Sequence, residues 1–176
     1  SYGDASCICI DIPIGLVDSG QNSRECDVMA RKLLGRDRGS SVFPPPCRHS
    51  LEASSYQEAC AINFQNTGRK ISRQAWGILQ KIMEVDTFLR SNIPASQVIR
   101  EVHPEVCFWA FDKKPMTYNK KYNKGGFHER LALVQRFLPE IQEGFFCAER
   151  KRLKKVQYDD LMDALVAGLT ASTMKF

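Results

Sequence analysis

The sequence predicts an α/β domain in which helices flank a mixed sheet of few strands. Two observations lead to this prediction: an apolar run of the buried-strand type near the N-terminus, and several later segments whose apolar residues recur at helical spacing. The chain has 176 residues, which fits one domain better than two, so we expect a single domain over residues 1–176. A domain of this size buries enough surface to fold without disulfides or zinc.

The first predicted element is a strand. Residues 6–13 form an apolar run whose end contains an acid, Asp11, and a proline, Pro13. Such runs are typical of strands buried on both faces of a mostly parallel sheet. We therefore expect Asp11 near the carboxyl end of this strand, and a turn from Pro13 to Gly15. Residues 97–102 are the second predicted strand.

Helical spacing of apolar residues accounts for most of the remaining chain. It predicts helices over residues 22–34, 51–63, 72–89, 127–138 and 157–173. Gly35 is placed to end the first helix, and Ser72 is placed to cap the third. Three prolines keep residues 40–46 in an extended loop, and residues 113–126 form a polar, lysine-rich loop. Two strands are few for a sheet-based domain, so we expect part of the sheet to be missing from this sequence.

Composition and cysteine content exclude several classes of protein. Apolar residues make up 43% of the chain and charged residues 26%, which is typical of a globular protein and not of a disordered one. No apolar run approaches the roughly 20 residues of a membrane span, so we do not expect this chain to be an integral membrane protein. Residues 1–4 lack the basic start of a secretory signal. The seven cysteines have no zinc-type spacing, and we expect reduced thiols in a cytoplasmic protein.

Acidic residues follow both predicted strands and open the last predicted helix. They are Asp11 after the first strand, Glu101 and Glu105 around the end of the second, and Asp159, Asp160 and Asp163 in the helix. Acids from two adjacent strand ends and one closely packed helix can converge on a single point, and Mg²⁺ or Mn²⁺ prefers such oxygen ligands. Two such ions about 4 Å apart promote an in-line phosphoryl displacement. The alternative for each acid is a structural role in a turn or a helix cap.

Basic side chains indicate where phosphate groups would bind. Arg24, Arg31 and Arg38 lie around the first predicted helix, and a guanidinium offers phosphate a planar fork of donors. Lys120 and Lys124 lie in a loop that also contains tyrosines, a combination that suits single-stranded nucleic acid. The net charge of +5 permits a polyanionic partner. The alternative for both groups is a solvated surface.

Two further patterns have both a functional and a structural interpretation. His103 follows the second predicted strand, where it can act as a general acid or base or as a partner of a metal ligand. The alternative is that His103 satisfies a turn through a backbone hydrogen bond. Cys7 and Cys9 alternate with apolar residues, and we interpret them as strand interior rather than as a pair of ligands.

The ordered set of motifs resembles a known family. The motifs include Ile10-Asp11-Ile12-Pro13-Ile14-Gly15-Leu16, Ser41-Val42-Phe43-Pro44, Glu101-Val102-His103-Pro104-Glu105 and Asp159-Asp160-x-x-Asp163-Ala164. Together they cover nearly the whole chain and are similar to the domain-of-unknown-function family 429, described as predicted nucleases with an RNase H-like fold. The resemblance implies an RNase H-like sheet flanked by helices and a Mg²⁺- or Mn²⁺-dependent site with Asp11, Glu101 and Asp160 or Asp163. Family members begin with a strand carrying Gly-x-Asp-Gly, which has no counterpart here, so the resemblance implies an N-terminally shortened domain.

From the residues and the resemblance we expect a divalent-metal-dependent nuclease or phosphodiesterase that acts on nucleic acid or nucleotides. Asp11, Glu101 and Asp163 are the expected ligands of Mg²⁺ or Mn²⁺. Two alternatives stay open. One is a non-catalytic RNase H-like binding or scaffold module, which the missing first-strand acid favours. The other is a small nucleotide phosphohydrolase, in which the arginines bind a nucleotide phosphate.

Overall fold

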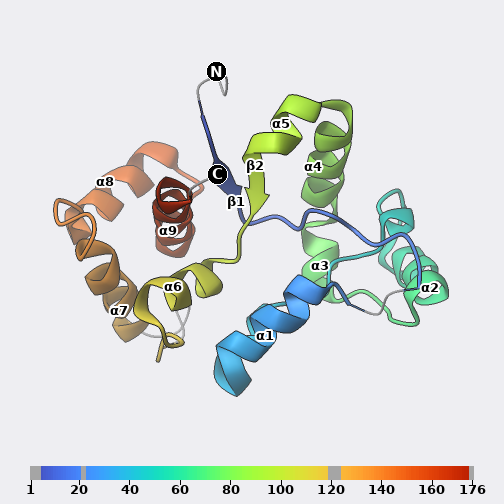
Figure 1. The fold of residues 1–176 in the computed structure, drawn as a ribbon, viewed down its shortest axis with the longest axis horizontal. Coiled ribbons are helices and arrows are strands. Elements are labelled where there is room, and N and C mark those ends of the chain that lie inside the picture. Colours follow the sequence, from blue (N-terminus) through green and yellow to red (C-terminus); the bar gives the residue numbers. More distant parts are fainter. Residues whose placement is uncertain (1–4, 21–22, 119–123, 175–176) are drawn as a thin grey trace. The chain divides into compact units, whose positions relative to one another are not determined.

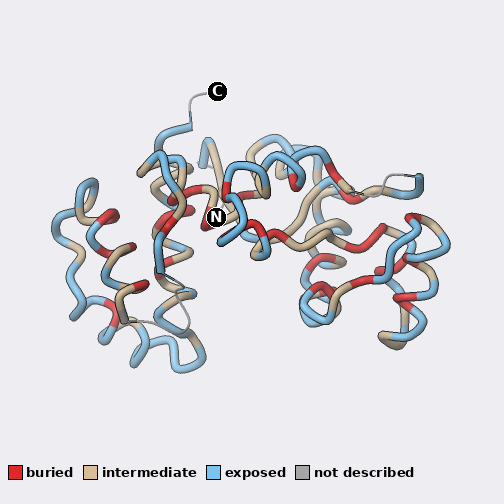
Figure 2. Tube along the Cα trace, turned by 90° about the horizontal axis from the view of Figure 1, so that it is seen from below, coloured by how far each residue is buried: buried red, intermediate tan, exposed pale blue. Residues whose placement is uncertain are grey.

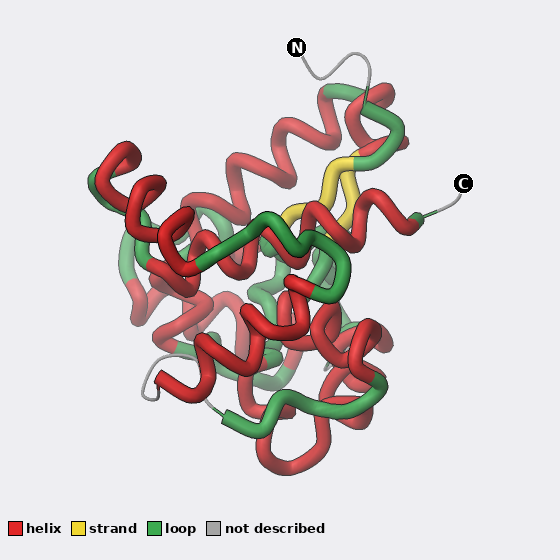
Figure 3. The backbone as a smooth tube through the Cα atoms, turned by 90° about the vertical axis from the view of Figure 1, so that its left-hand side faces the viewer, coloured by secondary structure: helices red, strands yellow, loops and turns green. Residues whose placement is uncertain are grey.

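The structure is a computed structural model that describes residues 5–20, 23–118 and 124–174 of the chain (Figure 1). It is mostly helical. Its two short strands, β1 (Ile8–Ile10) and β2 (Ile99–Glu101), pair as a parallel two-stranded sheet, shown in yellow in Figure 3. The chain is therefore mixed α/β in composition, and an RNase H-like arrangement stays a prediction.

The chain divides into two compact units. The first unit consists of Ser1–Ser6 and Ile12–Glu101, and the second consists of Cys7–Asp11 and Val102–Phe176. The second unit is thus discontinuous, because its first strand comes from the N-terminal part of the sequence. That residues 1–176 behave as one domain stays a prediction.

The first unit is built mainly from helices. They are α1 (Glu25–Arg38), α2 (Tyr56–Thr67), α3 (Arg73–Gly77), α4 (Leu79–Ser91), α5 (Ile93–Val98) and the short 3₁₀ helices η1 (Gly39–Ser41) and η2 (Arg48–Ser50). The predicted stop at Gly35 is observed as a break inside α1, where this residue has a φ of 66°. A left-handed φ costs glycine little, which explains why the break falls at this position.

Serine caps set two of the helix starts in the first unit. The Ser72 hydroxyl accepts the Ala75 N–H at 3.0 Å, so the predicted cap of α3 is confirmed. The Ser55 hydroxyl accepts the Glu58 N–H at 3.2 Å and begins α2 at Tyr56. The helix predicted over residues 51–63 therefore starts later than expected, because the preceding residues form η2 and a turn.

Trp76 connects the apolar clusters of the first unit. It packs against Leu79 and Ile82 on one side and against Ala59 and Ala75 on the other. Trp76 is thus part of the apolar core of the first unit. Buried and exposed residues alternate along the helices in Figure 2, as expected where a helix buries one face.

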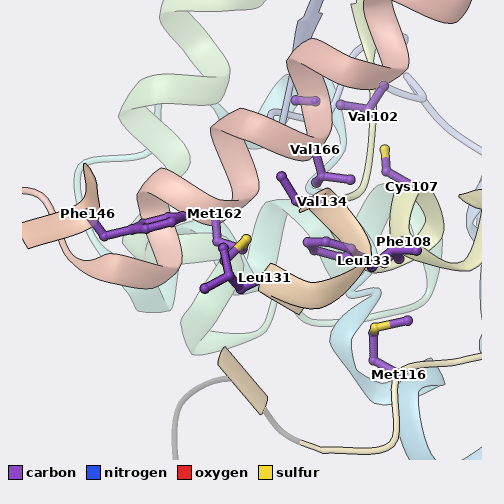
Figure 4. Close-up of a cluster of buried hydrophobic side chains, with 11 residues drawn as sticks. Val102, Cys107, Phe108, Met116, Leu131, Leu133, Val134, Phe146, Met162 and Val166 are labelled. Carbon is purple, nitrogen blue, oxygen red and sulfur yellow. The ribbon is translucent and has the colours of Figure 1, made fainter. Parts of the chain in front are cut away.

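The second unit is organised around its last helix. It contains β1, α6 (Pro104–Asp112), α7 (Lys124–Gln135), α8 (Glu143–Leu153) and α9 (Tyr158–Thr173), and α9 packs against each of the others. In Figure 4, Val166 of α9 points toward Val134, and Met162 lies beside Leu131. None of the helices in the described ranges combines the length and apolar character needed to cross a lipid bilayer.

A buried ion pair lies beside this core. Arg130 is fully buried, and its Nη2 contacts Glu105 Oε1 at 2.5 Å. Its Nη1 donates to the carbonyl groups of Tyr118 at 3.0 Å and Gly126 at 2.9 Å. Because a buried charge needs a partner, Arg130 and Glu105 tie α7 to the start of α6. Helix capping alone predicted an acid at position 105, but it did not predict this partner.

The first prediction concerns this ion pair. Glu105→Leu should lower the free energy of unfolding by about 3 kcal/mol or more, because it leaves the Arg130 guanidinium buried without its counter-charge. Urea denaturation measures the change. The double variant Glu105→Leu/Arg130→Met is the control, and it should recover much of the loss because no charge remains buried. A single variant as stable as the parent would contradict this account.

Candidate metal and phosphate-binding site

Two of the predicted metal ligands, Asp11 and Asp163, raise the pKa of the same buried thiol in the second unit, that of Cys107. Asp11 directly follows β1, and Asp163 lies on α9, which packs against β1. Burial raises the pKa of the Cys107 thiol, and the negative charges of Asp11 and Asp163 raise it further, while a hydrogen bond with Thr170 opposes the shift. Cys107 lies on α6, and α9 packs against both α6 and β1.

The donor chemistry of Asp11 and Asp163 fits a hard divalent cation. Mg²⁺ is usually held by one or two protein carboxylates, with water and substrate phosphates as its other ligands. Within the part of the chain that the structure describes, no group of three or more His, Cys, Asp or Glu side chains is arranged to hold a metal. A site at Asp11 and Asp163 would therefore depend on substrate and water oxygens to complete it.

Glu101, the third predicted ligand, belongs to the first unit and is occupied there. Its Oε2 accepts the Ile14 N–H at 2.7 Å and Arg24 Nη1 at 2.6 Å. Its Oε1 accepts Arg24 Nη2 at 2.6 Å. Glu101 thus ties the end of β2 to the turn after residue 11 and to the start of α1. Its role as a metal ligand stays a prediction.

Arg24 is buried and bound by two carboxylates. Its Nε and Nη2 donate to Asp27 at 2.9 and 2.7 Å, and its Nη1 also donates to the Ile14 carbonyl at 2.5 Å. Burial alone would lower the pKa of Arg24, but hydrogen bonds to Asp27 and Glu101 and the charges of both acids outweigh it and raise that pKa. Together with the bonds to Glu101, these contacts use every N–H donor of the guanidinium. Phosphate can bind Arg24 only by displacing one of these partners.

The other predicted phosphate-binding residues are scattered over several elements. Arg31 Nε donates to the Val42 carbonyl at 2.8 Å and so holds the loop after α1. Arg38 is buried at the end of α1. Lys120 lies outside the described residues. Lys124 begins α7, but its side chain also lies outside the described part. The phosphate-binding roles of all four residues stay predictions.

Asp160 and His103 occupy helix starts. The exposed Asp160 Oδ2 accepts the Gln157 N–H at 2.8 Å, and the two residues form a capping box that begins α9. The His103 carbonyl accepts the N–H groups of Val106 at 2.9 Å and Cys107 at 3.0 Å, which begins α6. The capping alternative is therefore observed for Asp160, whereas the His103 side chain makes no capping hydrogen bond to α6. Their catalytic roles stay predictions.

Sequence reasoning missed several neighbours of these residues. Asp27 pairs with Arg24, three residues behind it, and not with Arg31, four residues ahead. Both spacings place side chains on one helix face, so spacing alone did not decide between them. Thr170 and Cys107 lie beside the two acids of the second unit. Thr170 follows Asp163 by seven residues, a spacing that returns to the same helix face and is the signal that could have identified it.

Comparisons with known proteins place the chain in a family without assigning an activity. No curated protein and no solved structure gives a significant match. The family model described as "Protein of unknown function (DUF429)" matches residues 1–175, nearly the whole chain. This match confirms the resemblance drawn from the ordered motifs. The chain therefore belongs to the DUF429 family of proteins of unknown function.

Proposed function

We propose that this chain is a divalent-metal-dependent hydrolase that cleaves phosphodiester bonds in nucleic acid or nucleotides. The observation that supports the proposal best is that Asp11 directly follows β1 and Asp163 lies on α9, two elements that pack against each other. A carboxylate at a strand end and another on a helix packed against that strand can share one cation. The net charge of +5 favours a polyanionic substrate.

Asp11 and Asp163 have different surroundings that suit complementary roles. Asp163 is half-buried on α9, and its Oδ1 atom is enclosed, so the core fixes this carboxylate. Asp11 is exposed after β1 and is therefore accessible to a substrate. These two residues would hold Mg²⁺ or Mn²⁺, which when bound activates water and neutralises charge on the leaving oxygen.

A non-catalytic binding or scaffold module is the second candidate. The observation that favours it is the engagement of Glu101 by Arg24 and the Ile14 N–H. Asp160, the alternate ligand, likewise serves a helix cap. A family member in which acids hold the structure together rather than a metal would keep the fold without the chemistry.

The second prediction is that Mn²⁺ binds the chain through Asp11. Calorimetric titration with Mn²⁺ should give saturable binding that Asp11→Asn abolishes, because the variant removes a charged oxygen ligand. Asp37→Asn is the matched control: it removes an exposed carboxylate on α1, in the other unit, and should leave binding unchanged. Absence of binding to the parent chain would eliminate the hydrolase proposal and favour the non-catalytic module.

The same chain then identifies the substrate class. Single-stranded DNA, RNA and free nucleotides are compared in the presence of Mn²⁺, with Asp163→Asn as the inactive reference. Cleavage of long strands supports a nuclease. Release of phosphate from free nucleotides alone supports the nucleotide phosphohydrolase.

The third prediction concerns Asp163 itself. Asp163→Asn should raise the melting temperature without metal, because it relieves repulsion between this carboxylate and Asp11. It should also abolish the stabilisation by Mn²⁺, because a ligand stabilises only the state that binds it. Thermal unfolding with and without Mn²⁺ measures both effects. A destabilised variant with a normal Mn²⁺ response would mark Asp163 as a structural residue.

The fourth prediction separates the two roles of Glu101. Arg24→Gln should lower the free energy of unfolding by about 3 kcal/mol, because Asp27 and Glu101 lose their buried counter-charge. Arg36→Gln, at an exposed position of the same helix, should change that free energy by no more than about 0.5 kcal/mol. If Glu101 binds metal, its release in Arg24→Gln should tighten Mn²⁺ binding. Unchanged Mn²⁺ affinity assigns Glu101 a purely structural role.

A further inference from the structure

The second unit contains a cluster of sulfur atoms that the proposed hydrolase does not use. Cys7 Sγ lies 3.9 Å from Cys9 Sγ and 3.6 Å from Met174 Sδ. Cys7 precedes β1, Cys9 lies within it, and Met174 directly follows α9. We refer to Cys7, Cys9 and Met174 as the sulfur cluster.

The backbone explains why these sulfurs meet. Side chains two residues apart in an extended strand lie on the same face, so Cys7 and Cys9 share one side of β1. Because α9 packs against β1, its C-terminal end brings in the third sulfur. Met174 has an extended conformation, with φ −70° and ψ 124°, and this ends the helix beside Cys7.

The cluster is available to a small ion. Cys7 and Cys9 are half-buried, and neither is in a disulfide. The Met174 residue is 36% exposed. An ion can therefore reach all three residues without unfolding the core, while the partial burial limits competition from water.

The sulfur separations match those of ligands that share one metal ion. Two sulfurs that are each about 2.3 Å from an ion lie about 3.8 Å apart at a tetrahedral angle and about 4.0 Å apart at a trigonal angle. The Cys7–Cys9 separation of 3.9 Å and the Cys7–Met174 separation of 3.6 Å are close to these values. Only small side-chain movements are needed to bind an ion.

The donor set selects a soft ion. Thiolate and thioether ligands favour Cu(I), whereas carboxylate oxygens favour Mg²⁺ and Mn²⁺. We propose that Cys7, Cys9 and Met174 bind one Cu(I) ion. Each thiol releases its proton to solvent as it binds, so two thiolates and one neutral thioether surround the cation. The inference does not depend on the proposed hydrolase, because a different metal class and different residues are involved.

The fifth prediction tests this site in a chain without its exposed cysteines. Cys26 and Cys147 are exposed, so Cys26→Ser/Cys147→Ser provides the background and removes competing surface thiols. Cu(I) is titrated without oxygen against a coloured Cu(I) chelator. The background should keep one Cu(I) ion per chain in this competition, and Cys7→Ser in that background should lose it. Met174→Leu should weaken binding about tenfold, because two thiolates remain while the thioether is lost.

Met174→Leu keeps the test decisive if Cys7→Ser does not fold. It is a volume-conserving apolar change at the end of a helix, so the fold should be retained, which circular dichroism verifies. Zn²⁺ titrated in the same way should bind more weakly than Cu(I), because the thioether favours the softer ion. Equal Cu(I) affinity of the background and both variants would overturn the inference, as would loss of binding on forming the background itself.

Discussion

The packing of α9 against β1 is the contact on which the second unit depends. The helix also contacts α6, α7 and α8, so it is the element that all the others share. Its buried face supplies Met162 and Val166 to the core. Asp163 lies on this helix and Asp11 directly follows the strand, and the end of the helix brings Met174 to Cys7. One helix–strand contact therefore underlies the positions of these two acids and of the sulfur cluster.

Buried arginines are the second organising feature, one in each unit. Arg24 gathers Asp27, Glu101 and the Ile14 carbonyl, while Arg130 gathers Glu105 and two backbone carbonyls. Each guanidinium is too polar to be buried without partners, so the surrounding chain must take up a defined conformation around it. In the first unit, Glu101, which was predicted to bind metal, is the hydrogen-bond partner of Arg24. Structural and chemical uses of carboxylates thus compete in this molecule.

Local signals predicted the elements better than they predicted the contacts between them. Ser72, Gly35 and the apolar spacing of residues 157–173 marked features that the structure contains, because caps, breaks and helix faces depend on neighbouring residues. The predicted start of this helix, at residue 51, was wrong because the turn before Ser55 was not recognised, and α2 begins at Tyr56. Helix α8 was missed because its charged residues suggested only a solvated run. For the site, the candidate acids were found, but partners distant in sequence were not, since nothing in the residues around Glu101 indicates Arg24.

The discontinuous second unit has a consequence for how the chain acquires its structure. Strand β1 is synthesised before α9, the helix that packs against it. Between them, the ribosome must complete residues 11–157, and β1 lacks this neighbour until then. Contacts between such distant segments form slowly, because a long loop must close first. The nascent chain therefore exposes an apolar segment with two cysteines until α9 has been made. Chaperones that bind extended apolar segments are suited to protect it.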